Sequence, residues 1–227
     1  MLLLSADTSG KHGSIALVRC HENGSCQSIE VVPLLEGTFS AQLVPQIASL
    51  LSKHGLSKKD IGGFAVTTGP GSFTGLRVGL AAIKALAEVL AKPIAAVSLL
   101  EAVAVAAASS SGQVVAVMDA GRGEMFTGRY EVLSHSNPRV IGEELVRIDD
   151  FPHADEQRVV SPDERLANLL REKGIDVDVV EWPRSDAVAR LGWRKIQAGD
   201  TILPEQLEAN YIRRSDAEIS LNPSGIC

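Results

Sequence analysis

The sequence predicts an α/β fold built from two similar lobes, and three features of the chain point to it. Three short apolar runs separated by turn residues precede the first helical pattern, which is typical of an antiparallel meander. Helices and strands then alternate, so a parallel part of the sheet with crossover helices follows. The second half of the chain begins in the same way as the first. We therefore expect a tandem duplication with two mixed sheets.

Each element of the first half follows from its residue pattern. Apolar runs at residues 2–6, 14–18 and 29–35 predict the meander. Residues 40–54 place Leu43 and Ile47 on one helical face and polar residues opposite, which predicts an amphipathic helix. The remaining elements expected in this half are a strand at 63–68, a helix at 73–91 and a strand at 93–99.

The second half predicts a degraded copy of this unit. An apolar run at 114–118 ends in Asp119-Ala120-Gly121, much as the first strand ends in Asp7-Thr8-Ser9. The later elements are weaker: strands at 125–132, 139–148 and 177–181, and helices at 163–173 and 186–198. Each unit has a ribonuclease H-like layout, and two such facing lobes form the actin-like ATPase (ASKHA) architecture.

The lobes are predicted to span residues 1–108 and 109–227. The serine-rich stretch near 107–113 supplies the composition of a linker between them. We leave open on which lobe the terminal helix packs, the first lobe being one of the two choices.

Composition limits the function classes. The chain has 22 basic and 28 acidic residues, a net charge of -6 and a pI near 5.4, so we do not expect it to hold nucleic acid alone. Its three cysteines, Cys20, Cys26 and Cys227, form no Cys-x-x-Cys pair, and we expect neither a disulfide nor a zinc site. The N-terminus lacks a basic lead, and no apolar run approaches the ~18 residues of a membrane span. We expect a cytoplasmic protein that does not bind membranes.

A glycine-rich loop, residues 67–79, joins a predicted strand to a predicted helix. It contains no lysine between Gly69 and Gly79, so it is not a P-loop, and Thr74 stands where a dinucleotide fingerprint needs glycine. A nucleophile elbow is excluded because Ser72 lacks glycines two residues away on both sides. Gly69 and Gly71 instead permit a sharp turn, Ser72 or Thr74 can cap the helix, and free backbone N–H groups could hold an anion. A plain turn without ligand is the alternative.

Asp7 and Asp119 end equivalent strands and could face each other as paired carboxylates that hold a magnesium nucleotide. Alternatively, each closes its own turn by accepting a backbone N–H, and we favour this interpretation. The residues that could form a weak nucleotide or anion site are Asp7, Thr8, Ser9, Gly69, Gly71, Ser72 and Thr74. No residue has the setting of a general base, and none of the five histidines form a His-x-x-x-His pair. We therefore predict no catalytic residue, no metal site and no required cofactor.

The segment Gly69-Pro-Gly-Ser-Phe-Thr-Gly-Leu-Arg-Val-Gly79, together with Asp7-Thr8-Ser9, resembles the signature of the TsaB family, formerly YeaZ. The resemblance implies a scaffold that pairs with a catalytic paralogue, TsaD, in the complex that makes threonylcarbamoyl-adenosine in tRNA. It further implies the small ATPase TsaE as a partner, TsaC as the source of threonylcarbamoyl-adenylate, ATP use by the complex and tRNA contact only through it. The alternative function is an independent peptidase or small-molecule kinase of this fold.

The helix at 73–91 has a narrow polar stripe and two apolar faces, so one face is left for association. We expect a homodimer when the chain is alone and TsaD-like pairing in the complex, as the resemblance implies. The expected interface residues are Gly75, Leu76, Val78, Gly79, Ala82, Ala85 and Val89. The alternative is that the helix at 40–54 covers this face within the chain.

Near the C-terminus, Tyr211, Arg213 and Arg214 group an aromatic ring with two cations. Such a group can stack on a base and pair with a phosphate, or it can belong to a solvated terminal helix. The sequence leaves both interpretations open.

Overall fold

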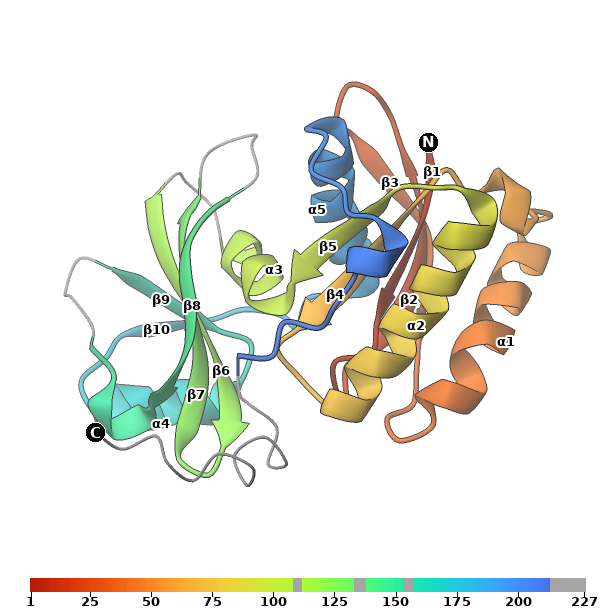
Figure 1. Ribbon diagram of the computed structural model, residues 1–227. Coiled ribbons are helices and arrows are strands. Elements are labelled where there is room, and N and C mark those ends of the chain that lie inside the picture. Colours follow the sequence, from red (N-terminus) through yellow and green to blue (C-terminus); the bar gives the residue numbers. More distant parts are fainter. Residues whose placement is uncertain (108–111, 133–137, 153–156, 213–227) are drawn as a thin grey trace.

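Two five-stranded sheets form the two lobes of the chain (Figure 1). The computed structural model describes residues 1–107, 112–132, 138–152 and 157–212. The first sheet has the order β3-β2-β1-β4-β5, with β1 (Leu2–Asp7), β2 (Ser14–Cys20), β3 (Cys26–Pro33), β4 (Gly63–Gly69) and β5 (Ile94–Ser98). β1, β2 and β3 are antiparallel neighbours, whereas β4 and β5 continue from β1 in parallel. The predicted meander and crossover arrangement is confirmed.

The second sheet repeats this topology. Its order is β10-β9-β6-β7-β8, with β6 (Gly112–Gly121), β7 (Glu124–Val132), β8 (Arg139–Arg147), β9 (Arg158–Ser161) and β10 (Val177–Val179). β6, β7 and β8 are antiparallel, and β9 and β10 add to β6 in parallel, as β4 and β5 add to β1. The two mixed ribonuclease H-like sheets expected from the sequence are thus present.

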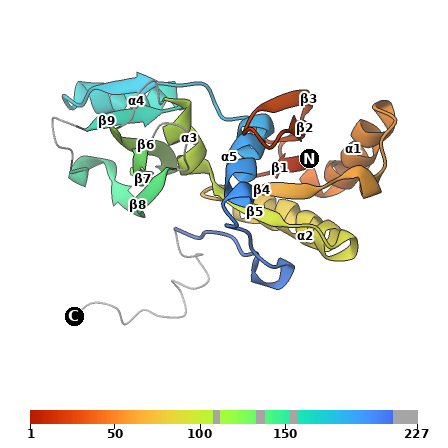
Figure 2. The ribbon, with the colours of Figure 1, turned by 90° about the horizontal axis from the view of Figure 1, so that it is seen from above.

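Helices cover both faces of the first sheet. α1 (Phe39–Lys53) and α2 (Phe73–Leu90) lie on one face, and α5 (Ser185–Gln197) lies on the other (Figure 2). All of β1 is buried for this reason: Leu4 packs in the core below α1 and α2, whereas Leu3 packs with Trp193 of α5.

The second sheet is covered by α3 (Leu99–Ala106) and α4 (Glu164–Glu172). α3 packs with Val114 and Ala116 of β6, and α4 packs with Val115 and Val117 from the opposite face of the same strand. α3 follows the last strand of the first sheet, and α5 follows the last strand of the second. Each lobe therefore sends its last helix to the sheet of the other lobe.

The predicted boundary at residues 108 and 109 falls outside the residues that the structure describes. α3 precedes this stretch and already packs on the second sheet, while α5 returns the chain to the first sheet. After α5 the chain passes the first core at Leu207 and reaches the second core at Ile212. Asn210, Tyr211 and Ile212 are not helical, so the interpretation of this segment as a terminal helix is wrong for them; Arg213 and Arg214 lie outside the described residues. In the part of the chain that the structure describes, no helix is long and apolar enough to cross a bilayer.

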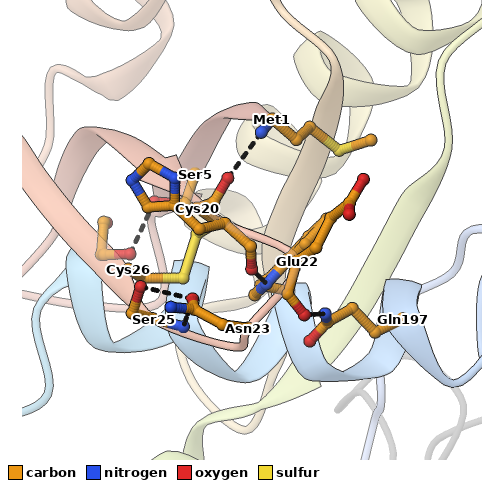
Figure 3. The surroundings of a disulfide bond; sticks show 11 residues. Met1, Ser5, Cys20, Glu22, Asn23, Ser25, Cys26 and Gln197 are labelled. Atoms are coloured by element: carbon orange, nitrogen blue, oxygen red, sulfur yellow. Dashed lines mark hydrogen bonds between the residues drawn. A yellow bond between two sulfur atoms is a disulfide. The ribbon is translucent and has the colours of Figure 1, made fainter.

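The expectation of no disulfide is wrong. Cys20 and Cys26 are joined by a disulfide at the end of the β2–β3 hairpin (Figure 3). The antiparallel register places the two residues directly opposite each other, with Cα atoms 4.1 Å apart. The search for Cys-x-x-Cys spacing missed a cross-strand pair, which depends on strand register.

Candidate functional site

A cleft of about 640 Å³ lies between the lobes. The first lobe contributes the turn after β1 and the glycine-rich loop after β4, and the second contributes the β6–β7 turn. Its lining residues that carry charge are Asp7, Lys11, Glu36, Asp119, Arg122 and Asp163, and its aromatic rings are those of His12, Phe73, Phe126, Trp182 and Tyr211. The sheets converge here because β1 and β6 both end at this cleft.

The two aspartates at these strand ends make the same local contact. The Oδ1 of Asp7 accepts the backbone N–H of Ser9 at 2.9 Å, and the Oδ1 of Asp119 accepts that of Gly121 at 2.8 Å. The interpretation that each aspartate closes its own turn is confirmed. The shared turn also supports the duplication, because both aspartates hold the same place after the first strand of their sheet.

The aspartates differ in their electrostatics. Asp7 is 2 % exposed, and burial raises the pKa of its carboxyl above the ordinary value, while the hydrogen bonds from Ser9 oppose this shift. Asp119 is exposed. Carboxylates outnumber cations along the cleft, which disfavours a bare anion there. Carboxylate oxygens suit Mg²⁺, so the donor chemistry fits a magnesium nucleotide better than a free phosphate.

The glycine-rich loop uses part of its hydrogen-bonding capacity within the chain. The backbone N–H of Ser72 donates to the carbonyl of Ser9 at 2.6 Å, and the Ser72 hydroxyl caps α2 by accepting from the N–H of Gly75. A Cβ on Gly71 would lie 2.4 Å from the Ser9 carbonyl oxygen, so glycine is needed for this close approach. The prediction that Ser72 can cap the helix is confirmed.

The predicted anion-site residues are only partly together. Asp7, Ser9, Gly71 and Ser72 line the cleft, whereas Thr8, Gly69 and Thr74 are not among its lining residues. The buried Thr8 hydroxyl donates to the carbonyl of Gly75 on α2 at 2.7 Å.

The small residues of α2 serve contacts inside the chain. A Cβ on Gly75 would lie 2.1 Å from the carbonyl oxygen of Thr8, and one on Gly79 would lie 2.3 Å from its hydroxyl. The turn after β1 therefore occupies the space beside Gly75 and Gly79, two residues that the sequence analysis assigned to the interface with a partner. Leu76 is also buried in the first core.

The rest of the expected interface lies further out on α2. Val78 and Ala82 are half-buried against the first core, beside α1. Ala85 and Val89 are exposed, Val89 by 75 %. The interface itself stays a prediction, now narrowed to the outer edge of the helix.

The sequence analysis missed two aromatic contacts at the cleft. The ring of His12, from the β1–β2 turn, stacks on Trp182, from the segment before α5, with centroids 4.4 Å apart and planes 16° apart. Burial, followed by the charge of Lys11, lowers the pKa of His12. These rings lie far apart in sequence, so no local pattern could have found their contact.

The second contact involves Tyr211, which the sequence analysis had singled out. Its hydroxyl accepts the Nε–H of Arg77 at 2.9 Å, its ring lies 5.1 Å from that of Phe73, and Arg77 lies over the Phe73 ring. The neighbouring Asn210 donates to Glu143 of β8 and to the Thr68 carbonyl. The C-terminal segment thus joins α2, the glycine-rich loop and the second sheet.

Over the described part of the chain, no three His, Cys, Asp or Glu side chains gather as metal ligands. Two ribonuclease H-like sheets around a cleft, each with an aspartate turn at its edge, define a two-lobed protein of the actin-like ATPase architecture.

Comparisons with known proteins place the chain more narrowly. The family model "TsaD: tRNA N6-adenosine threonylcarbamoyltransferase" matches residues 31–184. The chain is 29% identical over 229 residues to the tRNA threonylcarbamoyladenosine biosynthesis protein TsaB of Bacillus subtilis, covering 96% of each chain. With the TsaB of Escherichia coli it shares 31% identity over 134 residues, 58% of this chain and 55% of that one.

Two solved structures share the fold. YeaZ from Pseudomonas aeruginosa has a TM-score of 0.73 and 24% identity, covering 92% of this chain and all of that one. A protein described as similar to peptidase YEAZ from Pseudomonas aeruginosa has a TM-score of 0.74 and 26% identity, covering 93% and 99%. The chain belongs to the family that the TsaD model describes and, within it, to the TsaB (YeaZ) family of tRNA threonylcarbamoyladenosine biosynthesis proteins.

Proposed function

We propose that this chain is the scaffold subunit of the tRNA threonylcarbamoyladenosine machinery, which pairs with a TsaD-like catalytic paralogue and activates it. It acts in the cytoplasm and reaches tRNA only through the complex. Family membership supports the pathway, and the apolar outer face of the α1–α2 pair is the single structural observation that carries the scaffold role.

That face has no cover within the described chain. Val44 of α1 is 57 % exposed and Val89 of α2 is 75 % exposed, and the exposed Ala81 and Ala85 lie along α2 between the ends of the helix. Small side chains let a second helix approach closely, and exposed valines lose contact with water when it does. Two such helices from each of two subunits would form a four-helix contact. Alone the chain uses this contact for a homodimer, and in the complex the TsaD-like partner takes it.

The chain needs no cofactor for this role. ATP is used by the complex, with a TsaE-like ATPase as its further member. Any nucleotide in the cleft of this chain binds weakly and as a magnesium complex, because Asp7 and Asp119 face the space that the phosphates would enter.

A charge placed on the outer edge of α2 tests the proposal. Ala85→Glu and Val89→Glu leave the buried face intact, so both variants should fold, but an unpaired charge in the contact costs several kcal/mol. We expect each variant to sediment as a monomer and to lose co-purification with the TsaD-like paralogue. Leu169→Glu, which places glutamate at another exposed apolar position on α4, is the matched control and should behave as wild type.

Unchanged dimerisation and unchanged partner binding in both variants would reject this face as the interface. Measured turnover separates the scaffold from the independent peptidase or small-molecule kinase. A scaffold shows no ATP or peptide hydrolysis above background when isolated, and restores tRNA modification when the TsaD-like partner is added.

A further inference from the structure

A smaller cavity, of about 420 Å³, adjoins the interlobe cleft and shares Lys11, His12 and Trp182 with it. We call it the outer pocket. It is lined by Lys11, His12, Gly13, Ser14, Val31, Pro33, Leu34, Trp182 and Arg184. The stacked rings of His12 and Trp182 line both cavities.

The two cavities differ in charge. The cleft includes four carboxylates and two cations besides His12, whereas the charged side chains of the outer pocket are Arg184 and Lys11, which also lines the cleft. The carboxylates that act on His12, those of Glu36 and Asp163, lie on the cleft side. In a chain with a net charge of -6, a pocket whose charged side chains are both cations is a local exception.

Both cations remain available to a ligand. Lys11 is exposed and forms no ion pair with another described residue. Arg184 lies 3.4 Å from Asp186 but keeps 68 % of its side chain exposed. Asp186 pairs more closely with Arg190, at 2.8 Å, so that carboxylate is shared between two arginines.

The remaining walls suit a flat ring. Val31, Pro33 and Leu34 supply an apolar side, and the His12–Trp182 pair already holds two rings in parallel. A base can extend this stack on the exposed side of His12 or replace His12 against Trp182. The two cations and the stacked rings therefore suit a ligand that joins an anionic group to a flat ring, as a nucleotide does.

We propose that the outer pocket binds one nucleotide unit, with its phosphate between Lys11 and Arg184 and its base against the His12–Trp182 pair. The site adjoins the interlobe cleft, is distinguished from it by Arg184 and the apolar wall of Val31, Pro33 and Leu34, and does not rest on the scaffold role. One unit is too small a contact to hold a whole tRNA on an acidic chain, so the site agrees with the expectation that tRNA binds through the complex. The nucleotide is either free in solution or part of an RNA strand.

Binding is measured by calorimetry on the unmodified protein, at low salt and with EDTA. EDTA chelates Mg²⁺, so no magnesium nucleotide forms that could occupy the cleft. The probes are AMP, adenosine, inorganic phosphate and a short single-stranded oligoribonucleotide. We expect AMP to bind with a Kd on the order of 0.1–1 mM, and adenosine and phosphate at least about tenfold more weakly, because each lacks one half of the recognised group.

Trp182 gives an independent signal. The chain has two tryptophans, so Trp193→Phe leaves Trp182 as the only fluorophore of its kind, and bound AMP should quench it. Lys11→Glu and Arg184→Gln should each weaken AMP binding by about tenfold, the effect of a lost charge-assisted hydrogen bond. Lys59→Glu, at an exposed position that does not line this pocket, is the control and should leave binding unchanged.

Tighter binding of the oligoribonucleotide than of AMP, lost in the same two variants, identifies RNA as the source of the nucleotide; tighter binding of AMP identifies a free nucleotide. Absence of AMP binding, equal binding in the Lys11→Glu and Arg184→Gln variants, or phosphate binding as tight as AMP would each overturn the proposal.

Discussion

The two lobes share one topology but differ in what surrounds the turn after their first strand. In the first lobe this turn is packed: Thr8 is buried against α2, and the carbonyl of Ser9 receives the N–H of Ser72. In the second lobe the corresponding turn is open, and a Cβ on Gly121 would meet nothing within 4 Å. The duplicated unit has therefore kept its backbone pattern in both copies, and in the first copy the turn is packed against α2 and the glycine-rich loop.

The helices differ in the same direction. α2 has 18 residues and rests on β4, whereas α4 has 9 residues and rests near β9 and β10. The first lobe has a long, partly uncovered helix, and the corresponding helix of the second lobe is short. This difference supports the proposal that the first lobe mediates association.

Gly75→Ala should have the largest effect, because it breaks the packed turn of the first lobe. Alanine favours a helix over glycine by about 1 kcal/mol, so propensity alone predicts stabilisation. The added Cβ would lie 2.1 Å from the backbone carbonyl of Thr8, which cannot rotate away. We expect a net loss of about 3 kcal/mol in the free energy of unfolding, measured by urea denaturation.

Gly142→Ala in β8 is the control in the second lobe, because a Cβ there meets nothing within 4 Å. It should change stability by less than about 0.5 kcal/mol. If Gly75→Ala stabilised the protein, the turn after β1 would not be packed on α2 and the contrast between the lobes would fail.

The second prediction concerns the β2–β3 hairpin of the first lobe. The β2–β3 hairpin is closed by the Cys20–Cys26 disulfide, and its Glu22 carbonyl accepts a hydrogen bond from Gln197 of α5 (Figure 3). The neighbouring His21 carbonyl accepts a second one from Trp193 of α5. Closing so short a loop contributes about 2 kcal/mol in the chain-entropy description. Dithiothreitol should lower the unfolding free energy by up to that amount.

The Cys26→Ala variant is the control for this effect. It should start from the lower stability and show no response to dithiothreitol. A wild type that ignores the reductant while its thiols become titratable would show that the hairpin is held by its strand pairing and by α5 alone.

Much of the fold was predictable because its signals are local. The continuous apolar run that includes Leu3 and Leu4 marks β1, the Asp7 and Asp119 turns mark the duplication, and Ser72 marks the start of α2. α3 was missed because six of its eight residues are buried and it has no polar face to set its period. β9 has only four residues, too few for a pattern.

The site was less predictable because it depends on contacts between distant segments. Gly75 and Gly79 were recognised in the sequence as contact positions, but nothing local indicates that Thr8 packs against them. The same holds for the disulfide, which depends on strand register, and for the His12–Trp182 stack, which joins the two lobes.

Ser185→Ala should lower the free energy of unfolding by an intermediate amount, because Ser185 anchors the start of α5 to the first sheet through buried hydrogen bonds. Ser185 of α5 donates from its hydroxyl to the carbonyl of Ser14 at 2.6 Å, and its N–H donates to the Ser14 hydroxyl at 3.0 Å. All of these groups are buried, so the loss leaves an acceptor unsatisfied at a cost of about 1–2 kcal/mol.

Ser98, which precedes α3, is the matching residue of the other exchanged helix. Its hydroxyl lies 3.5 Å from that of Tyr130, a long contact. Ser98→Ala should therefore shift the thermal midpoint less than Ser185→Ala. Equal shifts would mean that the two exchanged helices are anchored equally.

The smallest net change in the free energy of unfolding is expected at the two equivalent aspartates, Asp7 and Asp119, and at Asp7 this change depends on pH. Asp7→Asn keeps an oxygen that accepts the Ser9 N–H but removes the buried charge. Because burial raises the pKa of Asp7 in the folded state above its ordinary value of 3.8, ionisation favours the unfolded chain. The wild type should therefore lose stability relative to Asp7→Asn as the pH rises from 3.8 through the folded-state pKa, and the gap should stay constant above it.

Asp119→Asn makes the same chemical change in an exposed turn, so its free energy of unfolding at neutral pH should lie within about 0.5 kcal/mol of the wild type. The asparagine at position 7 also gives a weaker acceptor than a carboxylate, which offsets part of the gain and keeps the net effect small. If Asp7→Asn instead destabilised the protein at neutral pH, the hydrogen bonds from Ser9 to the charged form would outweigh desolvation. The buried turn would then stabilise a charged carboxylate as well as the exposed turn does, and burial would not distinguish Asp7 from Asp119.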